Sequence, residues 1–101
     1  MNESRPEVHV VDNPSAERYE AHVGTELAAI LQYKVHGDHV AFTHAETDPR
    51  WEGKGVASRL AQLALDMTID NGHFIVPQCP FIVSYIERHP HYRDYIDPAR
   101  R

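Results

Sequence analysis

The chain has 101 residues, of which 42% are hydrophobic and 25% are charged, and its formal net charge at pH 7 is −5. This length fits one small globular domain, and the acidic balance argues against a protein that mainly binds the phosphate backbone of nucleic acids. The single cysteine excludes an internal disulfide, and the N-terminal residues lack the basic and apolar regions of a signal peptide, so we expect a cytoplasmic protein. No apolar run reaches the roughly 20 residues needed to cross a bilayer, so we expect no membrane partner.

The N-terminal half is predicted to form an antiparallel meander, because its hydrophobic residues alternate with polar ones and are interrupted by turn formers. Residues 1–7 are polar and include Pro6, which indicates a disordered terminus. The dipeptide Gly37-Asp38 is typical of a tight hairpin. The expected elements are strands over 8–11, 18–24, 26–36 and 39–47, with a turn over 12–15.

After Asp48-Pro49 the hydrophobic residues recur at the three- and four-residue spacing of an amphipathic helix. The short apolar run 74–76 has the composition of a buried strand, so we expect it inside a sheet. Pro80 suits the first position of a second amphipathic helix, which must end before Pro90. The expected elements are a helix over 55–70 that stops at Asn71-Gly72, a strand over 74–77, a helix from 80 and a turn over 92–96, all within one α+β domain over 8–97.

A glycine-rich loop, RWEGKGVA at residues 50–57, joins the last strand of the meander to the first helix. The first backbone N–H groups of a helix lack partners and carry about half a positive charge, so they can bind a pyrophosphate, and Arg50 and Lys54 add full charges. The loop differs from the phosphate loop of nucleotide hydrolases, because Gly55 stands where that motif has Ser or Thr. It also lacks the third glycine and parallel crossover of the dinucleotide fingerprint. The sequence therefore predicts a phosphate site, with a flexible turn as the alternative.

The pattern R-x-x-G-x-G between an antiparallel strand and a helix resembles the acyl-coenzyme-A loop of the GNAT N-acetyltransferase superfamily. The later motifs P-x-C-P-F and R-H-P-x-Y resemble a small single-domain branch of that superfamily, and the similarity extends from His44 to Tyr95. The resemblance implies a GNAT-like α+β fold with acetyl-CoA or coenzyme A as the cofactor. Full-length members carry an N-terminal helical pair that walls the acceptor pocket, and this chain lacks it.

The resemblance also implies which residues hold the cofactor. The pantetheine arm is expected between the strand that ends at Thr47 and the strand 74–76. Trp51 either shields the phosphates or packs the helix against the sheet. The residues implied for the pyrophosphate are Arg50, Gly53, Lys54 and Gly55, with the amides of Val56 and Ala57.

Four residues are candidates for the chemistry. Cys79 precedes Pro80 at the expected start of the second helix, where the helix dipole favours a thiolate, so it is either a nucleophile or an inert buried cysteine. Tyr85 resembles the tyrosine that protonates the departing coenzyme A thiolate in many members, and core packing is its alternative. His44 and Glu46 share one face of a strand and could take the proton from an ammonium acceptor.

The predicted function is acetyl transfer from acetyl-CoA to a primary amine, either a protein lysine or a small amine, and the net charge of −5 suits a cationic acceptor. The alternatives are a non-catalytic module that binds coenzyme A or acyl-CoA, and an interaction domain without a cofactor. The neighbouring pairs His36/His39 and His89/His91 lack a third ligand, so we expect no metal site.

Overall fold

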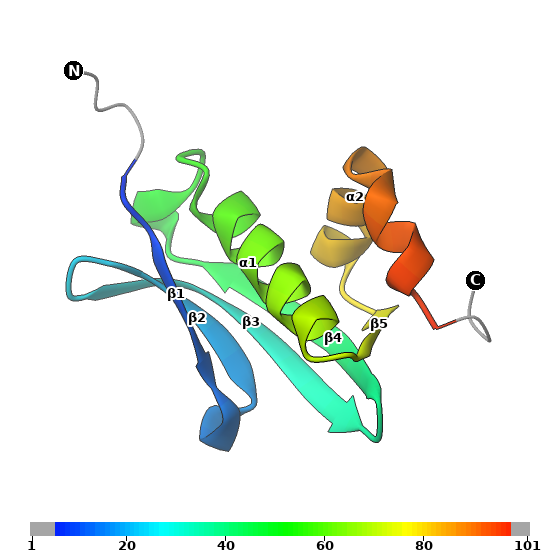
Figure 1. Ribbon diagram of the computed structural model, residues 1–101. Helices are drawn as coiled ribbons and strands as arrows, with labels where there is room; N and C mark the ends of the chain where they lie inside the picture. The colour runs from blue at the N-terminus through cyan, green and yellow to red at the C-terminus, as the bar shows by residue number, and fades with distance from the viewer. Residues whose placement is uncertain (1–5, 98–101) are drawn as a thin grey trace.

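Five strands form one sheet in which each strand lies beside its neighbours in the sequence, in the order β1-β2-β3-β4-β5. The computed structural model describes residues 6–97, and Figure 1 shows both α-helices on the same face of the sheet. The first four strands are antiparallel, which confirms the predicted meander, and β5 runs parallel to β4. The fold is α+β, as predicted. Its elements are β1 His9–Asn13, β2 Arg18–Val23, β3 Glu26–His36, β4 His39–Thr47, α1 Val56–Asp70, β5 Phe74–Pro77 and α2 Pro80–Arg88.

The hydrophobic core fills the space between the sheet and the two helices. Leu60, Ala64 and Leu65 form one side of α1 and are almost fully buried, as the predicted helical spacing requires. They meet inward-facing residues of the sheet such as Leu31 and Phe42. The opposite face of the sheet, which we call the open face, has no described helix over it (Figure 1).

β1 is shifted relative to the prediction. It begins at His9 rather than at residue 8, and it continues through Asp12 and Asn13, which were expected in a turn. Both residues stay in the strand because they pair with β2. The turn is instead the short 3-10 helix η1, Pro14–Ala16, which is closed by Glu17 with a φ of 53°.

Of the predicted disordered terminus, residues 1–5 lie outside the described residues, and Pro6 and Glu7 precede β1 without regular structure. Between β1 and β2 the chain has no α-helix, in agreement with the missing helical pair.

A β-bulge in β4 was not predicted. Phe42 pairs with Tyr33 and His44 pairs with the adjacent Gln32, so Thr43 is an extra residue on β4. The bulge changes which side chains face the helices. Phe42 faces them before the bulge, and Ala45, whose partner on β3 is the buried Leu31, faces them after it. His44 and Glu46 are therefore left on the open face.

The prediction that the strand 74–76 lies inside a sheet was wrong. β5 is the last strand of the sheet, and on its outer side it has only an isolated bridge between Ile75 and Ile96. Ile75 and Val76 are nevertheless buried, whereas Phe74 and Pro77 are half-buried. Both α1 and α2 contact β5, and the C-terminal segment bridges part of its edge. The apolar composition of this segment correctly predicts that it is buried. Helices can bury a strand at the edge of a sheet, so burial does not require a strand on both sides.

The segment after α2 forms the 3-10 helix η3, Pro90–Tyr95. It starts two residues before the predicted turn, because Pro90 takes the first helical position. Tyr92 of η3 is buried, and its hydroxyl donates a hydrogen bond of 2.8 Å to Asp66 of α1. The tyrosine of the R-H-P-x-Y motif therefore anchors this segment to the first helix.

Candidate functional site

The strands β4 and β5 separate halfway along β4. Their pairing ends at Phe42 and Pro77, and the last backbone bond between the two segments runs from Gln78 N to Phe42 O at 3.0 Å. Beyond this point β4 continues to Thr47, whereas the chain after β5 turns into α2. Parallel strands that part in this way leave unpaired backbone on both sides of the split. This is where the coenzyme arm was expected.

The glycine loop lies at the open end of this split. Gly53 and Gly55 have φ values of 76° and 83°, a region that favours glycine. Gly55 is the N-cap of α1, and no side chain caps the helix. The first N–H groups of α1 therefore have no side-chain acceptor, as an anion-binding helix start requires.

A cavity of about 340 Å³ lies between this loop and the start of α2. Five of the predicted cofactor residues line it, together with Trp51 and with Phe81 of α2, which the sequence reading did not single out. The pattern gave a signal for Phe81, because it follows Pro80 in the P-x-C-P-F motif. The lining residues are Thr47, Trp51, Glu52, Gly53, Gly55, Val56, Ala57, Ser58 and Phe81.

Two predicted phosphate ligands, Arg50 and Lys54, do not line that cavity. Lys54 lines a neighbouring concavity of about 390 Å³, together with Gly55 and the N-terminal segment 6–9. Arg59 also lines this concavity and was missed by the sequence reading. The sequence could have indicated Arg59, because it follows Gly55 by four residues and this spacing puts the two residues on one side of the first helical turn. Lys54 and Arg59 thus bring two cations to the loop.

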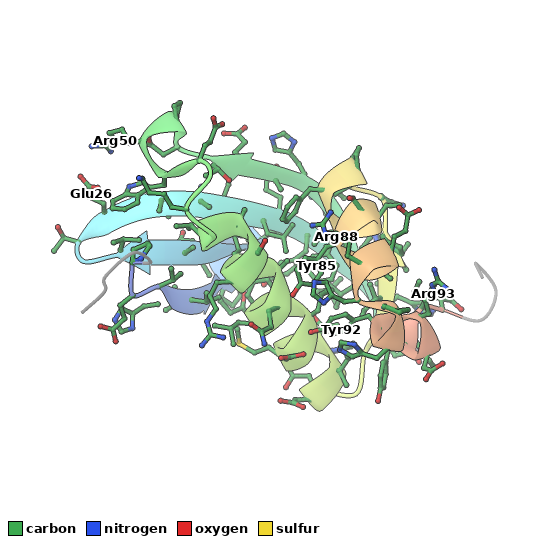
Figure 2. The ribbon with its side chains drawn as sticks, turned by 90° about the horizontal axis from the view of Figure 1, so that it is seen from above. Glu26, Arg50, Tyr85, Arg88, Tyr92 and Arg93 are labelled. Atoms are coloured by element: carbon green, nitrogen blue, oxygen red, sulfur yellow. The ribbon has the colours of Figure 1, made fainter. Side chains whose placement is uncertain are left out.

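The Arg50 guanidinium is already held by two carboxylates. Its Nη1 lies 3.1 Å from Oε2 of Glu26, and its Nη2 lies 3.1 Å from Oδ2 of Asp48. The hydrogen bond from Arg50 lowers the pKa of the Asp48 carboxyl. Figure 2 shows Arg50 and Glu26 together at one end of the molecule.

The proposed base pair is formed but lies on the open face. Nε2 of His44 is 2.8 Å from Oε2 of Glu46, and the two side chains are 51% and 67% exposed. They share a face of β4, as predicted. A third concavity, of about 410 Å³, lies on the open face and reaches Thr43 and Gln78 at the base of the split. This concavity borders the strand that carries His44.

Cys79 is the N-cap residue of α2, at the helix start where the sequence placed it. The residue is only 3% exposed and belongs to the core. It is a free cysteine.

Tyr85 lies between α1 and α2 (Figure 2). Its ring stacks on His89 with centroids 4.1 Å apart, and burial, with the nearby Asp66 carboxylate, raises its pKa. Phe81, about one helical turn earlier, lines the loop cavity, whereas Tyr85 does not. The four catalytic candidates therefore occupy three environments: the open face, the core at the start of α2, and the contact between the helices.

Three of the four histidines considered for a metal contact other side chains. His39 lies between two carboxylates, 2.9 Å from Asp38 and 2.7 Å from Asp97. The ring of His89 stacks on Tyr85, and the ring of His91 makes a tilted contact with Tyr92. Among residues 6–97, no group of three His, Cys, Asp or Glu side chains is arranged to hold a metal ion.

The mixed sheet, the split after Phe42 and the uncapped glycine loop before α1 define a GNAT-type domain. The sequence matches the model of the GCN5-related N-acetyl-transferase family over residues 18–95, so the chain belongs to that family. No curated protein matches the sequence.

Among solved structures, the fold is similar to the solution structure of a GCN5-like protein from Staphylococcus aureus, whose own assignment as an N-acetyltransferase is provisional. The TM-score is 0.67 at 16% identity, with 88% of this chain and 87% of the other covered. This similarity supports the fold. Neither described helix is long and apolar enough to cross a membrane.

Proposed function

We propose that the protein transfers an acetyl group from acetyl-CoA to a primary amine. The observation that carries the proposal is the cavity of about 340 Å³ between the uncapped start of α1 and Phe81 of α2, beside the split between β4 and β5. Its residues suit the cofactor, because free amides and two left-handed glycines accommodate a pyrophosphate closely. Space also remains around Gly53, where an added Cβ would meet no atom within 4 Å.

The loop residues would bind and orient the cofactor. The amides at the start of α1 face the pyrophosphate, and Lys54 and Arg59 at the neighbouring concavity supply positive charge. When bound, acetyl-CoA supplies a thioester, whose acyl carbon accepts a nucleophile. The unpaired backbone between Thr47 and Phe42 directs the pantetheine arm into the split.

The base of the reaction would act from the open face. An amine acceptor is protonated at neutral pH and must lose a proton before it can attack. In the His44–Glu46 pair, the carboxylate orients the imidazole and stabilises its charge after it takes that proton. The exposure of both side chains lets protein-bound as well as free amines reach them.

Two routes for the transfer remain to be separated. In the first, the acceptor amine attacks the thioester directly, and Tyr85 returns a proton to the coenzyme A thiolate. In the second, the Cys79 thiolate attacks the thioester carbon and coenzyme A leaves as its thiolate, after which the amine attacks the acetyl-cysteine and releases the Cys79 thiolate. The second route requires Cys79, a residue that is only 3% exposed, to become accessible from the split.

A non-catalytic module that binds acyl-CoA is the second candidate. The observation that favours it is the separation of the catalytic candidates: Cys79 is in the core, and Tyr85 does not line the loop cavity. Both functions require the same cavity, so binding alone does not separate them.

Two measurements test the proposal. Calorimetric titration with acetyl-CoA should show binding, and its absence would refute both functions. Mass spectrometry after incubation with acetyl-CoA and lysine peptides should show acetylated peptide that decreases at least tenfold in His44→Gln. Binding without transfer to any amine would favour the module.

Cys79→Ala and Tyr85→Phe separate the two routes. An acetylated protein that disappears in Cys79→Ala would establish the covalent route. Normal transfer by Cys79→Ala with reduced transfer by Tyr85→Phe would establish the direct route. If both variants transfer at the parent rate, the assignment of these two residues is wrong.

A further inference from the structure

The first residue of β3 is joined to the glycine loop, although it lies far from that loop in the sequence. The carboxylate of Glu26 uses both oxygens: Oε2 accepts from Nη1 of Arg50 at 3.1 Å, and Oε1 accepts from Nε1 of Trp51 at 3.2 Å. We propose that Glu26 is a positioning residue that fixes the glycine loop in the shape that binds the pyrophosphate. The proposal deepens the proposed function and rests on it.

The contacts of Trp51 connect Glu26 to the cavity. Trp51 lines the cavity beside Gly53 and Gly55, and its ring also packs on the core. The indole N–H is its one hydrogen-bond donor, and that donor is used on Glu26. Glu26 thereby sets the orientation of the aromatic wall that stands next to the two glycines. Neither role that the sequence left open for Trp51 includes this contact.

The contacts of Arg50 show how Glu26 adds to the attachment that Asp48 provides. Asp48, just before the loop, binds Arg50, accepting from its amide at 2.9 Å and from Nε at 3.2 Å. Asp48 also donates its own amide to Ala28 O at 2.8 Å, which attaches this end of the loop to β3. Glu26 adds a second attachment to the same strand, this time through side chains. Two attachments to β3, one through Asp48 and one through Glu26, therefore hold Arg50 and Trp51 without a ligand.

This arrangement gives Arg50 a different role from the one that the resemblance implied. Its guanidinium is engaged by Glu26 and Asp48 and does not line the loop cavity. Arg50 then acts by holding the loop, and the direct charge on the phosphates comes from Lys54 and Arg59. A loop fixed before binding loses less entropy when the ligand arrives, so this attachment should raise affinity more than it raises stability. Exposed ion pairs contribute little to stability by themselves.

The experiment compares Glu26→Ala and Glu26→Gln with the parent protein. Glu26→Ala removes both acceptors and should weaken acetyl-CoA binding about tenfold in calorimetry. Glu26→Gln keeps one carbonyl oxygen for the indole and should fall between the two. The matched control is Glu17→Gln, since Glu17 is another surface glutamate in an ion pair, 2.8 Å from Lys34, and does not line the loop cavity. Its affinity should stay within about twofold of the parent.

Two further readouts distinguish positioning from general destabilisation. The chain has one tryptophan, so its indole N–H gives a single NMR signal that should shift in Glu26→Ala without ligand. In addition, the effects of Arg50→Gln and Glu26→Gln on affinity should not add in the double variant, because both break the same attachment. Additive losses would show that Arg50 contacts the phosphates by itself, and would overturn the proposal.

The remaining outcomes are also decisive. Parent-like affinity of Glu26→Ala, with the parent protein binding acetyl-CoA, would overturn the positioning role and leave the proposed function intact. Absence of binding by the parent protein would refute the proposed function. In that case the indole signal alone decides whether Glu26 holds the loop, and an unshifted signal in Glu26→Ala would overturn that as well.

Discussion

Glu20 of β2 should make the stability of this domain depend on acid pH. Its side chain is only 11% exposed, and its carboxylate has three hydrogen-bond partners on the open face. Asn13 lies at 2.9 Å, Arg18 at 2.8 Å and His22 at 2.9 Å. The hydrogen bonds from Asn13, His22 and Arg18, in that order of size, lower the pKa of Glu20 from 4.5 to about 2.

The sign and size of the effect follow from this difference in pKa. A carboxyl whose folded pKa is lowered stabilises the fold above its unfolded pKa, and that stability is lost as the pH falls toward the folded value. Each pKa unit corresponds to about 1.4 kcal/mol. As the pH falls from 5 to 2.5, protonation of Glu20 should therefore lower the free energy of unfolding by about 2–3 kcal/mol.

The assay is urea denaturation of the parent and Glu20→Gln at steps between pH 7 and pH 2.5. At pH 7 the variant should be less stable by about 1–3 kcal/mol, because Arg18 and His22 lose a charged acceptor. The two curves should converge as the parent's Glu20 takes up a proton. Glu17→Gln, which removes an exposed carboxylate, should run parallel to the parent. Parallel curves for the parent and Glu20→Gln would refute the reasoning.

Three further substitutions test the loop and the core. Gly53→Glu, at a φ of 76°, should abolish acetyl-CoA binding in calorimetry, because the new residue is strained there and places a negative charge at the phosphate site; a normal binding heat would contradict the site. Leu65→Ala empties a fully buried position and should lower the free energy of unfolding by about 2–5 kcal/mol in chemical denaturation, and a loss below about 1 kcal/mol would mean that the core is packed differently. Tyr92→Phe removes the donor to Asp66 and should cost about 1–2 kcal/mol of stability with no change in acetyl-CoA affinity. Reduced affinity would show that Tyr92 does more than anchor η3.

The sequence predicted the strands and helices because their hydrophobic spacing and their glycine and proline boundaries depend on local geometry. The hairpin at Gly37, the start of α1 after Gly55 and the start of α2 at Pro80 all belong to this class. The bulge at Thr43 could not be predicted in the same way, since it depends on how many residues the partner strand offers. The place of β5 at the edge of the sheet likewise depends on tertiary contacts.

The part of the candidate site that depends on local geometry could also be predicted from the sequence. The amides of Val56 and Ala57 could be placed at the cavity, because a helix start after two glycines fixes them locally. The engagement of Arg50 by Glu26 could not, since 24 residues separate the two in sequence. The burial of Cys79 and the contact of Tyr85 with α1 also arise only when α2 packs on the rest of the domain.

The outer edge of β5 limits how copies of this domain could assemble. The carbonyl of Ile75 already accepts the amide of Asp97 at 3.2 Å, and Pro77 has no N–H to donate. A neighbouring molecule therefore finds few free backbone groups there for continuing the sheet. β1, at the other end of the strand order, keeps such groups. An intermolecular sheet would therefore extend more readily from β1 than from β5.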